Sequence, residues 1–320
     1  MNLSVCSLHA STPFQRVPSL HSLSRCPFHC RKALGRNRQS QRAGKRRCGS
    51  LIASAVSVDV ANSASQIFEH VMSTATEPHP GWLTGAVLSS GVFIFGYKIL
   101  RKGLSPLGVA NAWFLGASVF SAFGLGGYIL VCLYFILGTL VTKLKIKQKQ
   151  QEGIAEAKSG ERGPASVWGS GIAGIACALL ALYTGQYDLL QVGFVASFAS
   201  KLCDTVSSEI GKGFGRTTYL ATTFKIVPRG TEGAVSLEGT LAGLGAALGL
   251  AAVAYLANQV SLSGAGIVVG AALLANFLES YLGAAMQGRM KWLNNDLVNM
   301  VQISLAAAMA VGASSVKFVL

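Results

Sequence analysis

The feature that most constrains this chain is a series of apolar stretches that starts at Trp82 and continues to the C-terminus. Only 12% of all residues are charged, against about 25% in average soluble domains. A helix needs about 20 apolar residues to cross the hydrocarbon core of a bilayer, and several stretches approach this length without a charge. The sequence predicts an all-α, polytopic membrane helical bundle of about eight transmembrane helices. The expected spans are 82–100, 107–123, 128–142, 167–184, 189–203, 241–258, 267–286 and 298–316.

Lysine and arginine are distributed unevenly over the polar segments between these stretches. The segments after the first, third, fifth and seventh spans, with adjoining span ends, hold sixteen cations, and those after the second, fourth and sixth hold none. One further lysine, Lys317, lies near the C-terminus. Because loops rich in lysine and arginine stay on one side of a membrane, we expect one cationic face that carries every polar loop of interest. Both ends of the membrane domain are expected on the other face.

The first 58 residues have a composition of their own, with ten Lys and Arg, many serines and no Asp or Glu. This composition is typical of an organelle transit peptide. We expect residues 1–54 to be a plastid transit peptide. The alternatives are a mitochondrial transit peptide and a disordered basic tail that stays attached. Residues 55–80 are then a short linker with a short amphipathic helix, and 81–320 the integral membrane domain. Most of the net charge of +14 lies in the leader, so nucleic acid is not an expected partner.

The membrane domain has no histidine and no closely spaced cysteines, two features on which many enzymes depend. All five histidines precede Gly81, which excludes a histidine base, a catalytic triad and a histidine-ligated metal from the domain. The three cysteines of the domain, Cys132, Cys177 and Cys203, are far apart in apolar surroundings, so neither a disulfide framework nor a paired-cysteine zinc site is expected.

The polar segment 201–239 interrupts the apolar pattern with four carboxylates and five cations. Polar groups this dense beside membrane spans are costly and usually functional; a solvated loop that only fixes topology is the alternative. On a helix, Lys201, Asp204 and Ser208 would share one face. A carboxylate beside hydroxyls suits Mg²⁺. The alternative interpretation of Lys201 and Asp204 is a plain ion pair at the membrane edge. The glycine-rich part that follows can bring backbone N–H groups close to phosphate.

A second polar segment, 140–171, is expected on the same face. Lys143 and Arg162 are placed to meet an anion there. The run of Lys145, Lys147 and Lys149 is expected only to fix topology.

A third polar segment joins the last two spans. Glu279 lies within an apolar run, and several Asn and Asp residues crowd the start of the final span. A helix cap accounts for Asn294 or Asn295 but not for the whole set.

Glycines in and beside the sixth span, Gly239, Gly243, Gly245 and Gly249, are expected to allow close approach of helices. No phosphate-binding glycine motif is present: the chain has neither G-x-x-x-x-G-K-[ST] nor G-x-G-x-x-G after a strand. A soluble P-loop kinase or a Rossmann domain is therefore not expected.

Five motifs follow one another along the membrane domain. They are L-G-T-L-V-T-K (137–143), D-T-V-S-S-E-I-G-K (204–212), T-T-F-K-I-V-P-R-G-T-E-G-A-V-S-L-E-G-T (222–240), E-S-Y-L-G-A-A-M-Q (279–287) and N-D-L-V-N (295–299). Together they resemble the transmembrane protein 19 family from about residue 82 onward; Glu279 departs from it, since relatives commonly have Asp. A weaker likeness relates the segment 203–215, with Lys225 and Glu232, to polyprenol kinases and CTP-dependent phosphatidate cytidylyltransferases.

With a plastid leader, the resemblance implies a phytyl-phosphate kinase of the vitamin E pathway. Such an enzyme converts phytyl phosphate to phytyl diphosphate, feeding tocopherol and phylloquinone synthesis and recycling phytol from chlorophyll. The implied co-substrate is a nucleoside triphosphate, with CTP favoured over ATP, and the implied cofactor is Mg²⁺. The implied location is a chloroplast membrane, the inner envelope, with the cationic site toward the stroma. The oligomeric state is left open.

The motifs also give the candidate site residues, grouped here by expected role. The catalytic candidates are Asp204, Glu209, Lys212 and Lys225. Those for binding substrate and phosphate are Lys143, Arg162, Ser208, Thr223, Arg229, Gly230, Thr231, Gly233, Ser236, Asn295 and Asn299. The metal candidates are Asp204, Glu209, Glu232, Glu279 and Asp296.

Phosphoryl transfer to an acceptor that is already an anion needs no strong general base. It needs charge neutralisation and in-line positioning, which carboxylate-held Mg²⁺ and Lys or Arg side chains supply. Two alternatives stay open. A carrier or flippase for a phosphorylated isoprenoid would show cations on both faces or at mid-membrane, and a CTP-dependent cytidylyltransferase would release pyrophosphate.

Overall fold

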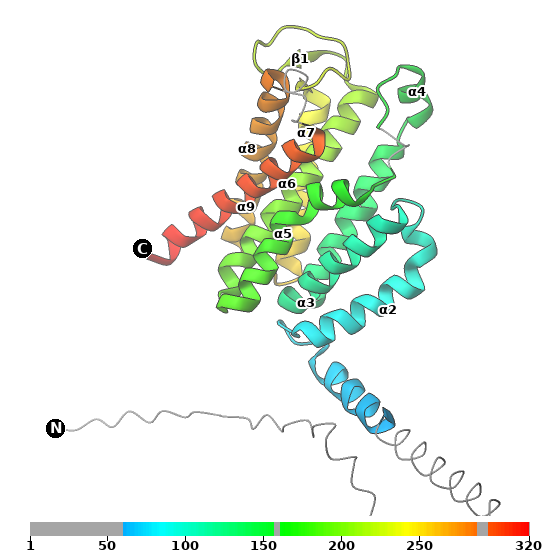
Figure 1. The fold of residues 1–320 in the computed structure, drawn as a ribbon. Coiled ribbons are helices and arrows are strands. Elements are labelled where there is room, and N and C mark those ends of the chain that lie inside the picture. Colours follow the sequence, from blue (N-terminus) through cyan, green and yellow to red (C-terminus); the bar gives the residue numbers. More distant parts are fainter. Residues whose placement is uncertain (1–59, 157–160, 287–293, 320) are drawn as a thin grey trace, which may run out of the picture. The chain divides into compact units, whose positions relative to one another are not determined.

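The computed structural model describes residues 60–156, 161–286 and 294–319, and the predicted transit peptide lies outside them. Seven helices in the described part are long and apolar enough to cross a membrane, which confirms an all-α polytopic membrane protein. They are α2 (Trp82–Leu100), α3 (Pro106–Lys143), α5 (Pro164–Thr184), α6 (Tyr187–Phe214), α7 (Leu237–Leu256), α8 (Leu262–Met286) and α9 (Asn295–Val319) (Figure 1). The short helix α4 (Ile146–Gln151) and the strands β1 (Thr218–Leu220) and β2 (Ala234–Ser236) complete the order. Residues 60–74, in the predicted linker, are also helical.

Helix α3 contains two of the expected spans, because it folds back on itself at Gly124. Gly124 has φ 60° and ψ −159°, which breaks the helical backbone. Residues 116 and 128 would lie about 18 Å apart along a straight helix. Instead, a Cβ built on Gly116 would lie 3.0 Å from the ring of Tyr128, and the rings of Phe120 and Tyr128 are 5.5 Å apart. The two arms, 106–123 and 125–143, therefore correspond to the second and third predicted spans.

Helix α6 is the centre of the bundle and packs against α3, α5, α7, α8 and α9. Phe194 and Phe198 are fully buried on it, and their rings meet at 5.4 Å. Phe123 from α3 stacks on Phe194 at 4.8 Å, and Tyr134 from the second arm of α3 meets Phe198 at 5.4 Å. A helix with neighbours all round is held in place on every side, so residues along it are suited to a fixed site.

Helix α7 crosses α6 through two glycines. A Cβ on Gly239 would lie 2.5 Å from the backbone oxygen of Ser207, and one on Gly243 would lie 2.8 Å from that of Cys203. The sequence-based expectation of close approach is confirmed at these two positions. It is wrong for Gly245 and Gly249, since a Cβ at either would meet nothing within 4 Å.

The polar loops meet at one end of the bundle, as the distribution of charge predicts. The α2–α3 turn pairs with the segment before α5, because Ser105 N donates to Arg162 O at 3.0 Å. Lys145 Nζ, before α4, donates to Gly213 O at the end of α6 at 2.9 Å. The start of α5 meets the start of α9, where a Cβ on Gly169 would lie 3.1 Å from Asp296 O. Figure 1 shows α4 and β1 at this end.

The α6–α7 crossing gives a matched pair of variants. Gly243→Ala places a methyl group 2.1 Å from Ser207 Oγ, and such overpacking costs about 1–3 kcal/mol. We expect a lower midpoint of thermal unfolding for the detergent-purified protein. Gly249→Ala enters open space and gains helix propensity, so its midpoint should equal or exceed that of the wild type. Equal midpoints for the two variants would contradict the close crossing.

Candidate active site

A polar cavity of about 470 Å³ lies at the end of the bundle where the polar loops meet. Its walls come from the second arm of α3, the α4–α5 segment, α5, α6, the β1–β2 loop, α8 and the start of α9. Most of the sequence-predicted site residues line it, namely Asp204, Glu209, Lys212, Arg162, Ser208, Gly230, Thr231, Gly233, Ser236, Asn295, Asn299, Glu232, Glu279 and Asp296. The three polar segments of the sequence thus form one site.

The floor of the cavity holds a buried ion pair on α6. Lys201 Nζ donates to Asp204 Oδ2 at 2.5 Å and to Asn299 Oδ1 of α9 at 2.9 Å. The hydroxyl of Ser208 donates to Asp204 Oδ1 at 3.3 Å. The ion pair, left open as one reading of the sequence, is present, and it lines the cavity. The shared face predicted for Lys201, Asp204 and Ser208 is confirmed.

A second buried ion pair joins α4 to α6. Lys149 Nζ is bound to Glu209 Oε2 and donates to Thr142 O at 2.8 Å. The side chains of Lys149 and Glu209 are 1% and 2% exposed, and Lys212 Nζ lies 3.6 Å from Glu209 Oε1. The prediction that Lys149 only fixes topology is therefore wrong. Glu209 holds lysines near both carboxylate oxygens, so in this arrangement it is a partner in ion pairs rather than a free metal ligand.

The β1–β2 loop covers one side of the cavity. The two strands pair antiparallel, with Thr218 opposite Ser236. Gly230 and Gly233 have φ of +83° and +70°, conformations that favour glycine. Gly230 lies against Ile154, and Gly233 lies against the backbone of Ser280 in α8. These two contacts hold the loop between the α4–α5 segment and α8.

Four predicted residues do not line the cavity. Thr223 and Lys225 lie at the exposed tip of the β1–β2 loop, and Lys143 is exposed at the end of α3. Arg229 donates to both carboxylate oxygens of Glu152, at 3.0 and 3.1 Å. The expectation that these four side chains meet the substrate is not supported by this arrangement, because three face solvent and the fourth has an acidic partner.

Two predicted residues at this end act as helix caps. Ser236 Oγ accepts from Gly239 N at 3.1 Å and so caps α7. Asn294 Oδ1 accepts from Leu297 N at 2.9 Å and caps α9, which confirms the expected cap. Asn295, Asp296 and Asn299 of α9 line the cavity. The start of a helix attracts anions, so the first turn of α9 suits a phosphate-binding site.

Arg162 stands where α3 meets the start of α5. Its Nη1 donates to Tyr134 OH at 3.0 Å, and its guanidinium lies 5.2 Å from the centre of the Tyr134 ring. Its backbone N donates to Gly103 O at 2.9 Å. Tyr134 was not singled out from the sequence because nothing distinguishes it from the other aromatic residues of α3.

Carboxylates outnumber cations in the cavity lining. The acids are Glu156, Asp204, Glu209, Glu232, Glu279 and Asp296, and the cations are Arg162, Lys201 and Lys212. Of the ion pairs found among the described residues, none uses Glu232, Glu279 or Asp296. Glu279 lies near two acids, Asp204 and Glu232, and near one cation, Lys201. An excess of negative charge of this kind suits a cation.

The acids do not form a ready-made metal cage. No group of three or more His, Cys, Asp and Glu side chains in the described ranges is arranged to hold a metal ion. Mg²⁺ in phosphoryl-transfer sites uses one or two carboxylates, waters and the phosphates of the substrate. Glu232, Glu279 and Asp296 line one cavity from three different elements; they are ligands of the type that Mg²⁺ takes, and an ion there would need phosphate oxygens as further ligands.

The fold and the cavity define a polytopic helical membrane protein with a charged site at one end of its bundle. The family model described as "Integral membrane protein DUF92" matches residues 89–307, and the chain belongs to this family. This match confirms the resemblance to the transmembrane protein 19 family that the motifs carry.

Two relatives show how far the likeness extends. "Protein VTE6, chloroplastic" from Arabidopsis thaliana is 45% identical over 271 residues, which cover 82% of this chain and 81% of that protein. An "uncharacterized membrane protein" from Synechocystis is 44% identical over 233 residues, which cover 72% of this chain and 90% of that protein. No solved structure matches the chain.

The Lys149–Glu209 pair can be tested by removing one or both partners. Lys149→Met leaves Glu209 charged and buried, and breaking a buried pair in this way costs about 3–5 kcal/mol. We expect a large drop in thermal stability in detergent. The double variant Lys149→Met, Glu209→Leu should recover most of it, because an apolar pair replaces the ionic one. Lys147→Met, at an exposed position, is the control; equal stability of Lys149→Met and Lys147→Met would refute the pair.

Proposed function

We propose that the chain transfers the γ-phosphoryl group of a nucleoside triphosphate to phytyl phosphate, giving phytyl diphosphate and a nucleoside diphosphate. The observation that carries this proposal is one cavity that combines Arg162, Lys212 and the start of α9 with acids that have no ion-pair partner among the described residues. The 45% identity to a relative named as chloroplastic and the family motifs support a chloroplast membrane and the vitamin E pathway. CTP is the favoured donor, by the likeness to CTP-dependent lipid enzymes.

In this reaction an oxygen of phytyl phosphate forms a bond to the γ-phosphorus, and the bond from the γ-phosphorus to the β–γ bridging oxygen breaks. The acceptor oxygen carries negative charge, so no side chain has to remove a proton. Arg162 binds the acceptor phosphate, and Lys212 with the first turn of α9 binds the nucleotide phosphates. One or two of the carboxylates Glu232, Glu279, Asp296 and Asp204 would hold Mg²⁺ together with phosphate oxygens of the nucleotide. Bound there, Mg²⁺ neutralises the charge that develops on the transferred group.

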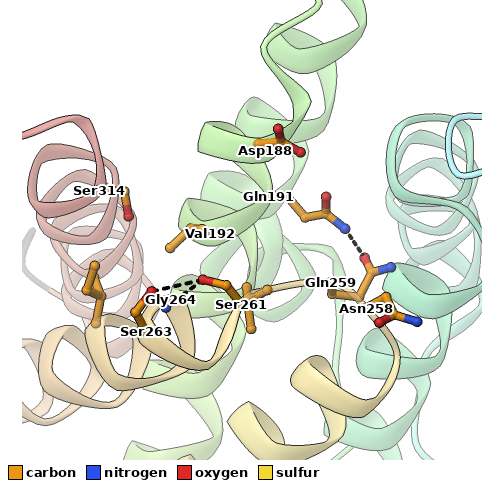
Figure 2. Close-up of a pocket in the computed structure, with 11 residues that line it drawn as sticks. Asp188, Gln191, Val192, Asn258, Gln259, Ser261, Ser263, Gly264 and Ser314 are labelled. Atoms are coloured by element: carbon orange, nitrogen blue, oxygen red, sulfur yellow. Dashed lines mark hydrogen bonds between the residues drawn. The ribbon is translucent and has the colours of Figure 1, made fainter. Parts of the chain in front are cut away.

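The alternative of a carrier for a phosphorylated lipid is disfavoured by the charges of the pocket at the opposite end of the bundle. A second pocket, of about 410 Å³, lies there between the α6 start, the α7–α8 loop and α9 (Figure 2). Gln191 donates to Gln259 at 2.6 Å across it, and Asp188 is the one charged residue among those that line it. Gln191 and Glu209 are about 27 Å apart along α6. A pocket with one acid and no lining cation does not suit release of a phosphate group.

The activity test uses the purified full chain in lipid with phytyl phosphate, γ-labelled nucleotide and Mg²⁺. We expect label in phytyl diphosphate and loss of the product when EDTA removes the metal. Glu279→Gln and Asp296→Asn should lower kcat by about 10²-fold or more, the scale for losing transition-state charge stabilisation. Glu161→Gln is the control, because Glu161 pairs with Arg101 at 3.5 Å and does not line the cavity.

Absence of labelled diphosphate, or activity that is unchanged in EDTA, would reject the kinase. Transfer of α-label with release of pyrophosphate would indicate cytidylyl transfer instead. Movement of phytyl phosphate across sealed vesicles without a nucleotide would indicate a carrier.

Substitutions of two arginines distinguish an arginine that binds phosphate in the cavity from one that only carries charge near it. Arg162→Gln removes a guanidinium from the cavity lining, and a hydrogen bond to a charged group contributes about 1.5–3 kcal/mol. We expect KM for phytyl phosphate to rise by about tenfold or more. Arg229→Gln should leave KM nearly unchanged, since Arg229 pairs with Glu152. Equal effects of the two substitutions would place the phosphate elsewhere.

A further inference from the structure

An apolar cavity of about 230 Å³ adjoins the polar one on the side of α2. It lies between α2, both arms of α3 and the start of α5. Phe93 of α2, Leu115, Val131 and Phe135 of α3 and Val167 of α5 line it. Its wall is almost entirely hydrocarbon, so water gains little by filling it and an apolar ligand gains by leaving water.

The two cavities share four lining residues: Tyr134, Arg162, Ser166 and Ser170. Arg162 donates to the hydroxyl of Tyr134 at 3.0 Å. The Tyr134 ring also packs edge-on against the ring of Phe198 in the bundle core. The polar groups of these four residues therefore mark the boundary between a charged compartment and an apolar one. A molecule that fills both has a polar head directly attached to a hydrocarbon chain, and the guanidinium of Arg162 at the boundary favours a head that is an anion there.

The outer wall of the apolar cavity is α2, which packs chiefly against α3 and lies at the margin of the bundle (Figure 1). The outward side chains of α2 are apolar: Phe95 is 92% exposed, and Ile94 is exposed as well. In a membrane these side chains face lipid. The apolar cavity is therefore separated from the bilayer by one helix with few other partners, and a lipid chain can reach it sideways.

We propose that this apolar cavity holds the first part of the isoprenoid chain of the substrate, with its phosphate at Arg162, and that the chain leaves toward the bilayer between α2 and α3. The inference rests on the proposed function and deepens it, because it assigns the residues that recognise the hydrocarbon. It makes Phe93, Val131 and Phe135 contacts of the chain and makes α2 the element that admits it.

Gly96 on α2 offers a way to fill the cavity without disturbing the fold. It lines the apolar cavity, and a Cβ there would meet only Leu100 Cδ1, at 4.0 Å. Gly91, also on α2, is the matched control: a Cβ there meets nothing within 4 Å, and Gly91 does not line the cavity. Gly96→Phe should occupy space that the chain needs, and Gly91→Phe should project away from it.

The test compares phytyl phosphate with dimethylallyl phosphate, whose short chain stays near Arg162, as acceptors for the full chain in lipid. For Gly96→Phe we expect kcat/KM for phytyl phosphate to fall by about tenfold or more, the loss for two methylene groups no longer buried. The kcat/KM for dimethylallyl phosphate should change by less than about twofold, because its short chain does not reach the added side chain. Gly91→Phe should match the wild type with both. Unchanged use of phytyl phosphate by Gly96→Phe, or equal loss with both acceptors, would overturn the chain site.

A binding measurement separates this inference from the proposed reaction. A phytyl phosphate analogue with a photoreactive group on its chain is irradiated with the full protein, and the labelled peptides are identified. Labelling of 92–100 and 128–136, reduced by Gly96→Phe and kept in Gly91→Phe, supports the chain site even where no diphosphate is formed. Labelling confined to other segments rejects it even where the kinase is active.

Discussion

The site depends on the burial of charged side chains on α6. Lys201, Asp204 and Glu209 lie in a helix that is surrounded by other helices, and an unpaired charge in such surroundings costs several kcal/mol. Each charge therefore has a partner nearby: Lys201 and Asp204 pair with each other, and Glu209 pairs with Lys149 of α4. Asn299 adds a contact from α9. These contacts fix where α4 and the start of α9 lie, so they also fix two walls of the cavity.

The pairing also decides which charges stay available for chemistry. Lysines occupy both oxygens of Glu209 and one of Asp204. The acids that remain without an ion pair among the described residues, Glu232, Glu279 and Asp296, come from the β1–β2 loop, α8 and α9. Because these three acids are held on separate elements, they are spread around the cavity wall and do not converge on one atom. Phosphate oxygens from a bound nucleotide would supply the ligands that such a space lacks for Mg²⁺.

Much of this arrangement could be predicted from the sequence. The length and hydropathy of each span, and the face of the membrane on which each lysine-rich loop lies, depend on the membrane rather than on how the helices pack. The spans, the shared face of the polar loops and the Lys201–Asp204–Ser208 face follow from such local rules. Lys149 could not be recognised, since only the left-handed backbone at Lys145 (φ 50°) directs α4 back so that Lys149 meets Glu209. Lys225 and Arg229 were expected in the site because a sequence does not show which side of a hairpin loop faces a cavity.

Arg162 connects the two compartments of the site to the fold. Its backbone joins the α2–α3 turn to the start of α5, through bonds to Gly103 and Ser105, while its side chain meets Tyr134 at the boundary between the polar and apolar cavities. The end of α2 and the guanidinium are therefore positioned by the same short bridge. In the proposed site, a displacement of α2 wide enough to admit a lipid chain would pull on Arg162, the residue proposed to bind the phosphate. Entry of the chain and placement of the head group would then be physically coupled.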